Sequence, residues 1–180
     1  NGNKLDGGQL ATGEHEMVWK VPAAGVYTLR YDDHSAGCAL RPDQNQQGAF
    51  VMERGKPNKI YNYISSFFYV PKGTRTIFLY AQKGGEPFGL RRPDGEWVGG
   101  KGGKDSSASM HLIGDGSYLT IPVPAGMDGA VWSALGINRG TFWFFNIPNV
   151  LSFSRDGVLV PADVAEKDKL VVEAGGTIRN

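Results

Sequence analysis

Residues that suit the binding of a sugar ring occur at three places in the sequence. A sugar ring has an apolar C–H face and a fringe of hydroxyl groups, so its site needs exposed aromatic rings for stacking and polar side chains for hydrogen bonds. Both kinds of side chain occur together around one tryptophan, in one Tyr-Asn-Tyr sequence and beside one Asn-Arg pair. The candidate ligand-binding residues are Trp97, Tyr61, Asn62, Tyr63, Asn138 and Arg139.

Each candidate also has a plainer structural interpretation. Trp97 follows the Arg-Pro-Asp-Gly turn sequence at 92–95 and precedes a glycine-rich stretch, which favours exposure, whereas a core position is the alternative. Tyr61 and Tyr63 share one face of a strand, so they equally fit an ordinary cross-strand aromatic ladder. Asn138 and Arg139 lie between two apolar runs, where a plain hairpin is the alternative.

Acidic side chains offer a set of calcium ligands. Calcium takes six to eight oxygen ligands from carboxylates, amides and carbonyls. We therefore expect a structural calcium ion, although no twelve-residue calcium loop of fixed spacing is present. The metal candidates are Asp32, Asp33 and Asp128, with Asp43 and Asn45 as further oxygen donors. Zinc is disfavoured, because the single cysteine and the three histidines show no ligand spacing.

A hydrolase is the less favoured interpretation. Glycosidases need two carboxylates separated in space, and pairs such as Glu14 with Glu16 belong to no recognisable catalytic motif. The Gly-x-Ser-x-Gly nucleophile motif is absent, and the glycine-rich stretch near Lys104 lacks the spacing and the Ser/Thr of a phosphate loop. The sequence therefore predicts a protein that is not an enzyme, with a small jelly-roll glycosidase or lyase as the minor alternative.

Composition narrows the classes of partner. The chain has 180 residues, of which 41% are hydrophobic, and this is enough apolar material for one core. The formal net charge is +1 and the basic residues are not clustered, so no nucleic-acid surface is expected. No apolar run is long enough to span a bilayer. Because the chain begins at Asn1 without a leader segment, we expect a piece of a longer or processed protein.

One small pattern occurs three times and predicts the elements that position these residues. An apolar strand ends in Val-Pro, a glycine follows two or three residues later, and a second strand leaves the turn, at 18–31, 67–80 and 119–135. Proline cannot donate a ladder hydrogen bond and glycine takes conformations that other residues resist, so each unit reads as strand, corner, strand. The sequence predicts an all-β protein, an antiparallel β-sandwich of the jelly-roll type with little or no helix.

Further strands follow from β-branched and aromatic enrichment between turn residues. Residues 1–161 are expected to form one domain, and 162–180 a linker or short helix that leads to a neighbouring domain. Residues 77–80 are apolar on both faces, as in a central or doubly covered strand. Trp19, Trp132 and Trp143 lie inside apolar runs and are expected in the core. The other strands are expected at 16–21, 26–31, 37–41, 49–53, 59–70, 74–81, 88–91, 96–98, 110–113, 117–123, 130–135, 142–145 and 151–154.

The wording of two segments resembles a known class of domain. Residues 19–31, with a strand ending before Pro-x-x-Gly and then a Tyr-x-Leu-x-Tyr strand, resemble the opening strands of galactose-binding-like jelly-roll carbohydrate-binding modules. Residues 68–74 and 88–95 look like accessory sandwich domains of secreted bacterial glycoside hydrolases. The resemblance implies a secreted, non-catalytic module that binds a polysaccharide, tethers a catalytic domain of the same parent chain, and often holds a structural calcium ion. A structural interdomain sandwich without glycan affinity is the alternative.

Overall fold

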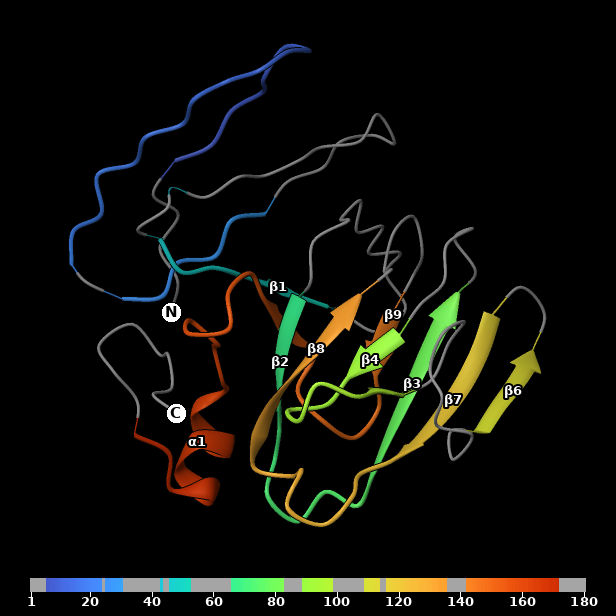
Figure 1. Cartoon of the computed structure of the whole chain (residues 1–180). Helices are drawn as coiled ribbons and strands as arrows, with labels where there is room; N and C mark the ends of the chain where they lie inside the picture. Colours follow the sequence, from blue (N-terminus) through green and yellow to red (C-terminus); the bar gives the residue numbers. More distant parts are fainter. Residues whose placement is uncertain are drawn as a thin grey trace.

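The computed structural model describes residues 6–23, 25–30, 43, 46–52, 66–82, 89–98, 109–113, 116–135 and 142–171. Within these ranges the chain forms ten strands in two antiparallel sheets, followed by one short helix (Figure 1). The elements are β1 (Ala49–Val51), β2 (Ser66–Val70), β3 (Thr76–Gln82), β4 (Gly89–Arg91), β5 (Trp97–Val98), β6 (Ser109–Ile113), β7 (Gly116–Pro122), β8 (Ala130–Leu135), β9 (Phe142–Phe144), β10 (Val150–Ser152) and α1 (Ala162–Asp168).

The two sheets confirm the predicted β-sandwich. Sheet A has the strand order β1-β10-β2-β8-β4-β5, and sheet B has the order β6-β7-β3-β9. Strands that are consecutive in the chain change sheets at two similar corners, between β2 and β3 and between β7 and β8. In each corner a backbone N–H bonds to the proline carbonyl three residues earlier, from Thr74 to Pro71 and from Met127 to Pro124.

A glycine stands third in each of these turns. Gly73 has φ 82° and Gly126 has φ 80°, a left-handed conformation in which a Cβ atom is strained. The Pro and Gly spacing in the sequence therefore specifies the corner geometry. In the third copy of the pattern, residues 18–23 and 25–30 form no strand.

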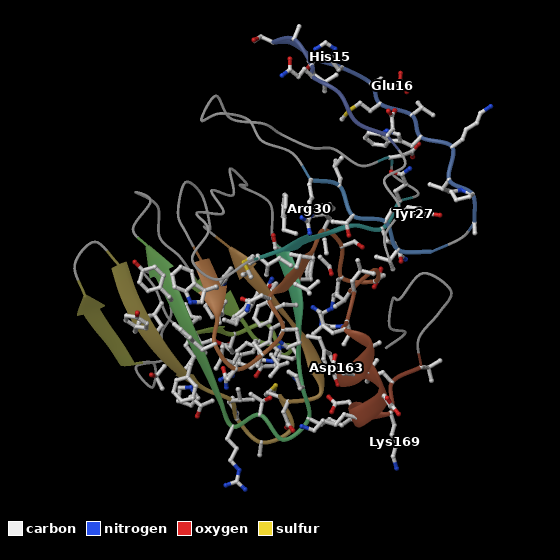
Figure 2. All side chains as sticks on the ribbon, turned by 180° about the vertical axis from the view of Figure 1, so that it is seen from behind. His15, Glu16, Tyr27, Arg30, Asp163 and Lys169 are labelled. Atoms are coloured by element: carbon white, nitrogen blue, oxygen red, sulfur yellow. The ribbon has the colours of Figure 1, made fainter. Side chains whose placement is uncertain are left out.

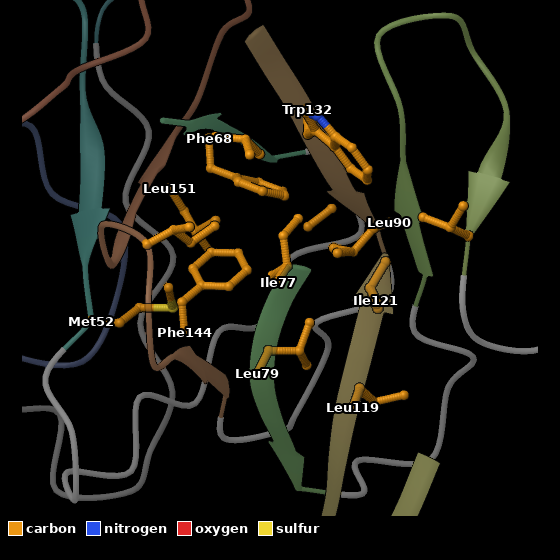
Figure 3. Close-up of a cluster of buried hydrophobic side chains, with 14 residues drawn as sticks. Met52, Phe68, Ile77, Leu79, Leu90, Leu119, Ile121, Trp132, Phe144 and Leu151 are labelled. Carbon is orange, nitrogen blue, oxygen red and sulfur yellow. The ribbon is translucent and has the colours of Figure 1, made fainter. Parts of the chain in front are cut away.

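The inner faces of the sheets meet in one hydrophobic core. Strand alternation turns Phe68 and Trp132 of sheet A toward Ile77, Leu79 and Phe144 of sheet B (Figure 3). All five side chains are almost completely buried, and Nε1 of Trp132 donates a 2.7 Å hydrogen bond to the Met127 carbonyl. The core position predicted for Trp132 is confirmed.

The outer face of sheet A is covered by the C-terminal part of the chain. Tyr69 and Val131 point outward from β2 and β8 and pack with Val158, Val160 and Ala165 of the segment that leads into and forms α1. Asp168 at the end of α1 is 3% exposed, and its Oδ2 accepts hydrogen bonds from the Tyr69 hydroxyl at 3.0 Å and from the Lys72 backbone N–H at 2.7 Å. These contacts fix the short helix against the sandwich.

The only described helix is α1, with seven residues, and none in the described ranges has the length and apolar character to cross a bilayer.

The N-terminal segment differs from the prediction. Residues 16–21 and 26–30 form no strand, and Val18 and Val26 are 80% and 67% exposed. The side-chain hydrogen bonds in this segment are local, such as the one from the Tyr27 hydroxyl to the Ala23 carbonyl. His15 and Glu16 lie on a run outside the two sheets (Figure 2). Alternation gives a strand its two faces, but a strand also needs a partner strand, and this segment pairs with none of the described strands.

Two of the three tryptophans predicted in the core are elsewhere. Trp19 belongs to the N-terminal segment and is 40% exposed, so its core placement is wrong. Trp143 of β9 is half-buried on the side of the strand opposite to the core residue Phe144. Its core placement is also wrong, because an apolar run does not show which of its two faces the second sheet covers.

The buried phenol of Tyr69 makes the stability of the fold depend on alkaline pH. Burial raises the pKa of Tyr69 well above its usual range, and the adjacent Asp168 carboxylate adds to the shift. Above pH about 10 the unfolded chain loses this proton while the folded chain keeps it, so the unfolding free energy falls as pH rises, by up to about 1.4 kcal/mol per pH unit.

We therefore expect the stability difference between the wild type and Tyr69→Phe to be constant below pH about 9 and to shrink above pH about 10. Denaturant unfolding of both proteins across this range measures it, and the subtraction removes the titration of the other tyrosines and the lysines. A difference that stays constant to pH about 11 would show that Tyr69 is not held protonated by the fold.

Candidate functional site: an aromatic face on sheet B

Aromatic side chains gather on the outer face of sheet B. Because successive residues of a strand point to opposite faces, β3 turns Ile77 and Leu79 into the core and Phe78 and Tyr80 outward. The same alternation turns Tyr118 of β7 outward, and it turns Trp143 of β9 and Phe145, the residue after β9, to the same side. We call this surface the aromatic face; its members are Phe78, Tyr80, Tyr118, Trp143 and Phe145.

The strand register brings these rings together from three strands. Tyr80 pairs with Tyr118 of β7 on one side and with Trp143 of β9 on the other. The ring centroids of Tyr80 and Trp143 are 4.3 Å apart with planes at 23°, and those of Tyr80 and Tyr118 are 5.2 Å apart at 64°. Phe145 stacks with Tyr118 at 5.6 Å. The rings therefore support one another, and each contact fixes its neighbours' orientation.

The aromatic face remains open to solvent. Phe78, Tyr118 and Phe145 are 45%, 37% and 39% exposed, although each lies within or directly beside a central part of the sheet. Tyr80 and Trp143 are half-buried by their neighbours. Sheet A differs, because α1 and the segment before it cover the outward side chains of Tyr69 and Val131.

The backbone under the aromatic face is held by Asn146. Its Oδ1 accepts the Phe78 backbone N–H at 2.9 Å, and its Nδ2 donates to the Thr76 carbonyl at 2.7 Å. The Phe145 N–H donates to the Phe78 carbonyl at 2.9 Å, so the chain continues alongside β3 after β9 ends. The Asn146 side chain thus makes hydrogen bonds to β3 that a paired strand would otherwise make, and it positions Phe145 over the sheet.

Trp97 lies on the other side of the sandwich. The predicted turn at 92–95 is confirmed: Arg92 N–H bonds to the Glu96 carbonyl, and Arg91 pairs with Trp97 in the β4–β5 hairpin. The neighbouring Val98 is buried in the core, so Trp97 faces outward from sheet A, half-buried, with the Arg91 guanidinium carbon 5.8 Å from its ring centroid. The structure does not bring Trp97 to the aromatic face.

The other predicted ligand-binding residues, Tyr61, Asn62, Tyr63, Asn138 and Arg139, lie outside the described residues. The strand ends that border them are adjacent, since Ser66 at the start of β2 pairs with Ala134 near the end of β8. Their roles stay predictions.

Only one of the three predicted metal ligands, Asp128, lies among the described residues. Asp32 and Asp33 lie outside the described residues. Asp128 is half-buried, and its Oδ2 accepts the Gly73 backbone N–H at 2.8 Å, which ties together the two corners of the sandwich. Among the residues that the structure describes, no three His, Cys, Asp or Glu side chains are grouped as a metal site requires. This hydrogen bond gives Asp128 a structural role, and its role as a calcium ligand stays a prediction.

Sequence reasoning missed the aromatic face although a signal was present. Residues 77–80 are apolar at every position, which correctly indicates a central strand between β7 and β9. The outward members of this run, Phe78 and Tyr80, are aromatic and the inward members, Ile77 and Leu79, are aliphatic, so the alternation separates two chemically different faces.

Neighbouring substitutions on β3 test which face is open. Phe78→Ala should change the unfolding free energy by less than about 1 kcal/mol, because the side chain is largely exposed. Leu79→Ala should cost about 2–5 kcal/mol, because it leaves a cavity between the sheets. Denaturant midpoints of the two variants measure this contrast. Equal losses at both positions would show that a further layer covers Phe78.

No family model matches the sequence, and the comparisons with curated proteins and with solved structures return no match.

Proposed function

We propose that this chain is a non-catalytic carbohydrate-binding module and that the glycan lies on the aromatic face of sheet B. The observation that carries the proposal is the open group of Phe78, Tyr118 and Phe145 beside the half-buried, stacked rings of Tyr80 and Trp143. Aromatic rings of this kind bind the apolar C–H faces of sugars, and phenol hydroxyls bond to the hydroxyl fringe.

Chemistry at the aromatic face favours binding over hydrolysis. A glycosidase places two carboxylates on either side of the bond that it cleaves. The described outward-facing residues of β3 and β7, such as Thr76, Tyr80 and Thr120, include no carboxylate. In this proposal the module tethers a catalytic domain of the same secreted parent chain to its polysaccharide, and a structural calcium ion would support the fold and not the reaction.

A second function is favoured by the same exposed surface. Apolar patches on soluble domains also mark contacts with other proteins, so the aromatic face suits a structural interdomain sandwich that packs against a neighbouring domain. The two functions differ in their need for a glycan. A binding module retains affinity for polysaccharide by itself, whereas an interdomain sandwich has none.

Retardation in polysaccharide affinity gels tests the proposal. We expect the wild type to be retarded by at least one glycan, and Phe78→Ala and Tyr118→Ala to weaken that affinity by about 1–3 kcal/mol each, roughly 5- to 150-fold in Kd. The loss has a simple cause, because each variant removes ring area that the sugar covers. Thermal unfolding of each variant confirms that the fold is kept.

Trp97→Ala is the matched control. It removes an outward ring from sheet A and should leave the affinity unchanged. Loss of affinity in this variant, with wild-type affinity in Tyr118→Ala, would move the site to sheet A. Gels run with calcium and with a chelator report separately whether a metal supports binding. Failure of every glycan to retard the wild type in either condition would favour the interdomain sandwich.

A further inference from the structure

We propose that the aromatic face recognises single, uncharged glycan chains, and neither the flat surface of a crystalline polysaccharide nor a polyanionic one. This inference rests on the proposed function and specifies its substrate class. Two independent properties of the face carry it, the angles between its rings and the absence of charge from its described outward strand positions.

The rings of the aromatic face do not share a plane. Tyr80 and Trp143 are nearly parallel, at 23°, but the ring of Tyr118 is turned by 64° from Tyr80. The ring of Phe145 is turned by 71° from Trp143 but lies at only 26° to Tyr118, so the rings form two nearly parallel pairs, Tyr80 with Trp143 and Tyr118 with Phe145. A crystalline polysaccharide presents many sugar rings in one plane, and it is matched by aromatic rings that lie flat in a common plane. Because the two pairs are inclined to each other by 64° to 71°, a flat surface cannot lie on both pairs at once.

Packing within the group prevents an easy change to a flat arrangement. Tyr80 and Trp143 stand on neighbouring, paired strands, and their 4.3 Å centroid distance is close to the ordinary strand spacing of about 4.8 Å. Rings stacked across that spacing stand on edge relative to the sheet. Turning either ring flat would break its stacking contact, so the uneven surface is a stable feature of the group.

An uneven aromatic surface suits one chain whose sugar rings differ in orientation. Successive sugars in a dissolved polysaccharide rotate about their glycosidic bonds, so one sugar can lie against the Tyr118–Phe145 pair while the next meets the differently inclined Tyr80–Trp143 pair. The hydroxyl groups of Tyr118 and Thr120 lie on neighbouring outward positions of β7 and can bond to sugar hydroxyls.

The outward positions of β3 and β7 whose side chains the structure describes carry no formal charge. On β3 they are Thr76, Phe78 and Tyr80, and on β7 they are Tyr118, Thr120 and Pro122. Recognition of carboxylate or sulfate groups uses Arg or Lys in direct, charge-assisted hydrogen bonds. These positions offer aromatic faces and hydroxyl groups, so they match neutral sugars.

A panel of paired polysaccharides tests the inference. Affinity gels containing hydroxyethylcellulose, xyloglucan, galactomannan, highly methyl-esterified pectin or polygalacturonate give the affinity for dissolved chains. Sedimentation with crystalline cellulose and crystalline chitin gives the affinity for flat surfaces. We expect retardation by at least one neutral chain, weakened at least about 5-fold in Tyr118→Ala. We expect no sedimentation with the crystals and no retardation by polygalacturonate.

The outcomes separate the two proposals. Binding to a crystalline surface, or binding to polygalacturonate that weakens as salt is added, would overturn this inference and leave glycan binding intact. Binding to a neutral chain that is the same in the wild type and in Tyr118→Ala, with Phe78→Ala also unchanged, would overturn the inference by placing the site elsewhere. Failure to bind any member of the panel would overturn both the inference and the proposed function.

Discussion

The alternation of side chains along each strand is the constraint on which the rest of the structure depends. It sends Ile77 and Leu79 into the core and leaves Phe78 and Tyr80 on the opposite surface of the same strand. Both sheets carry apolar outward residues in this way, so the outer face of each sheet must either be covered by other parts of the chain or stay exposed to solvent. On sheet A the chain itself provides the cover, because α1 and the preceding segment pack over Tyr69 and Val131. On sheet B the outward residues stay exposed, and the function of the molecule is to be sought in that difference.

Two aspartates hold the frame that presents this face. Asp168 binds the backbone of Lys72 and Asp128 binds that of Gly73, so both carboxylates act on the corner that connects sheet A with sheet B. The backbone N–H of Gly129 donates to the Val70 carbonyl and closes the second corner against the first. Gly129 has φ 64°, and a Cβ atom there would lie 2.7 Å from Cγ of Lys72, so the approach depends on glycine. Because hydrogen bonds to charged groups are stronger than neutral ones, this end of the sandwich has a fixed geometry.

Much of the fold could be predicted because its signals are local. Val-Pro before a glycine determines the two corners, and β8 begins and ends where β-branched and aromatic enrichment placed it, at Ala130 and Leu135. The wrong predictions concern which strand or layer a segment packs against, and a local sequence pattern does not contain that information. Residues 16–21 have the alternation of a strand but pair with no described strand, and Trp143 has apolar neighbours but lies half-buried on the outer side of sheet B. The aromatic face was missed for the same reason, since it is assembled from β3, β7 and β9 by pairing across long stretches of sequence. Trp97, which a local turn signal selected, does face outward, but on sheet A.

The chemical character of the open face indicates what kind of partner it suits. The covered outer face of sheet A combines aromatic and aliphatic side chains: Phe67 and Tyr69 pack there with Val131, Val158 and Val160, and the Tyr69 hydroxyl bonds to the buried Asp168. The layer on sheet B consists of aromatic rings, two of which carry hydroxyl groups. Such rings tolerate water at one edge and still offer a large apolar surface at another, so they can stay exposed between binding events. They also lose little conformational freedom on binding, because their neighbours already fix their orientation. A face that is fixed before its ligand arrives and stable in water without it fits reversible recognition of an amphipathic ring better than burial in a permanent interface.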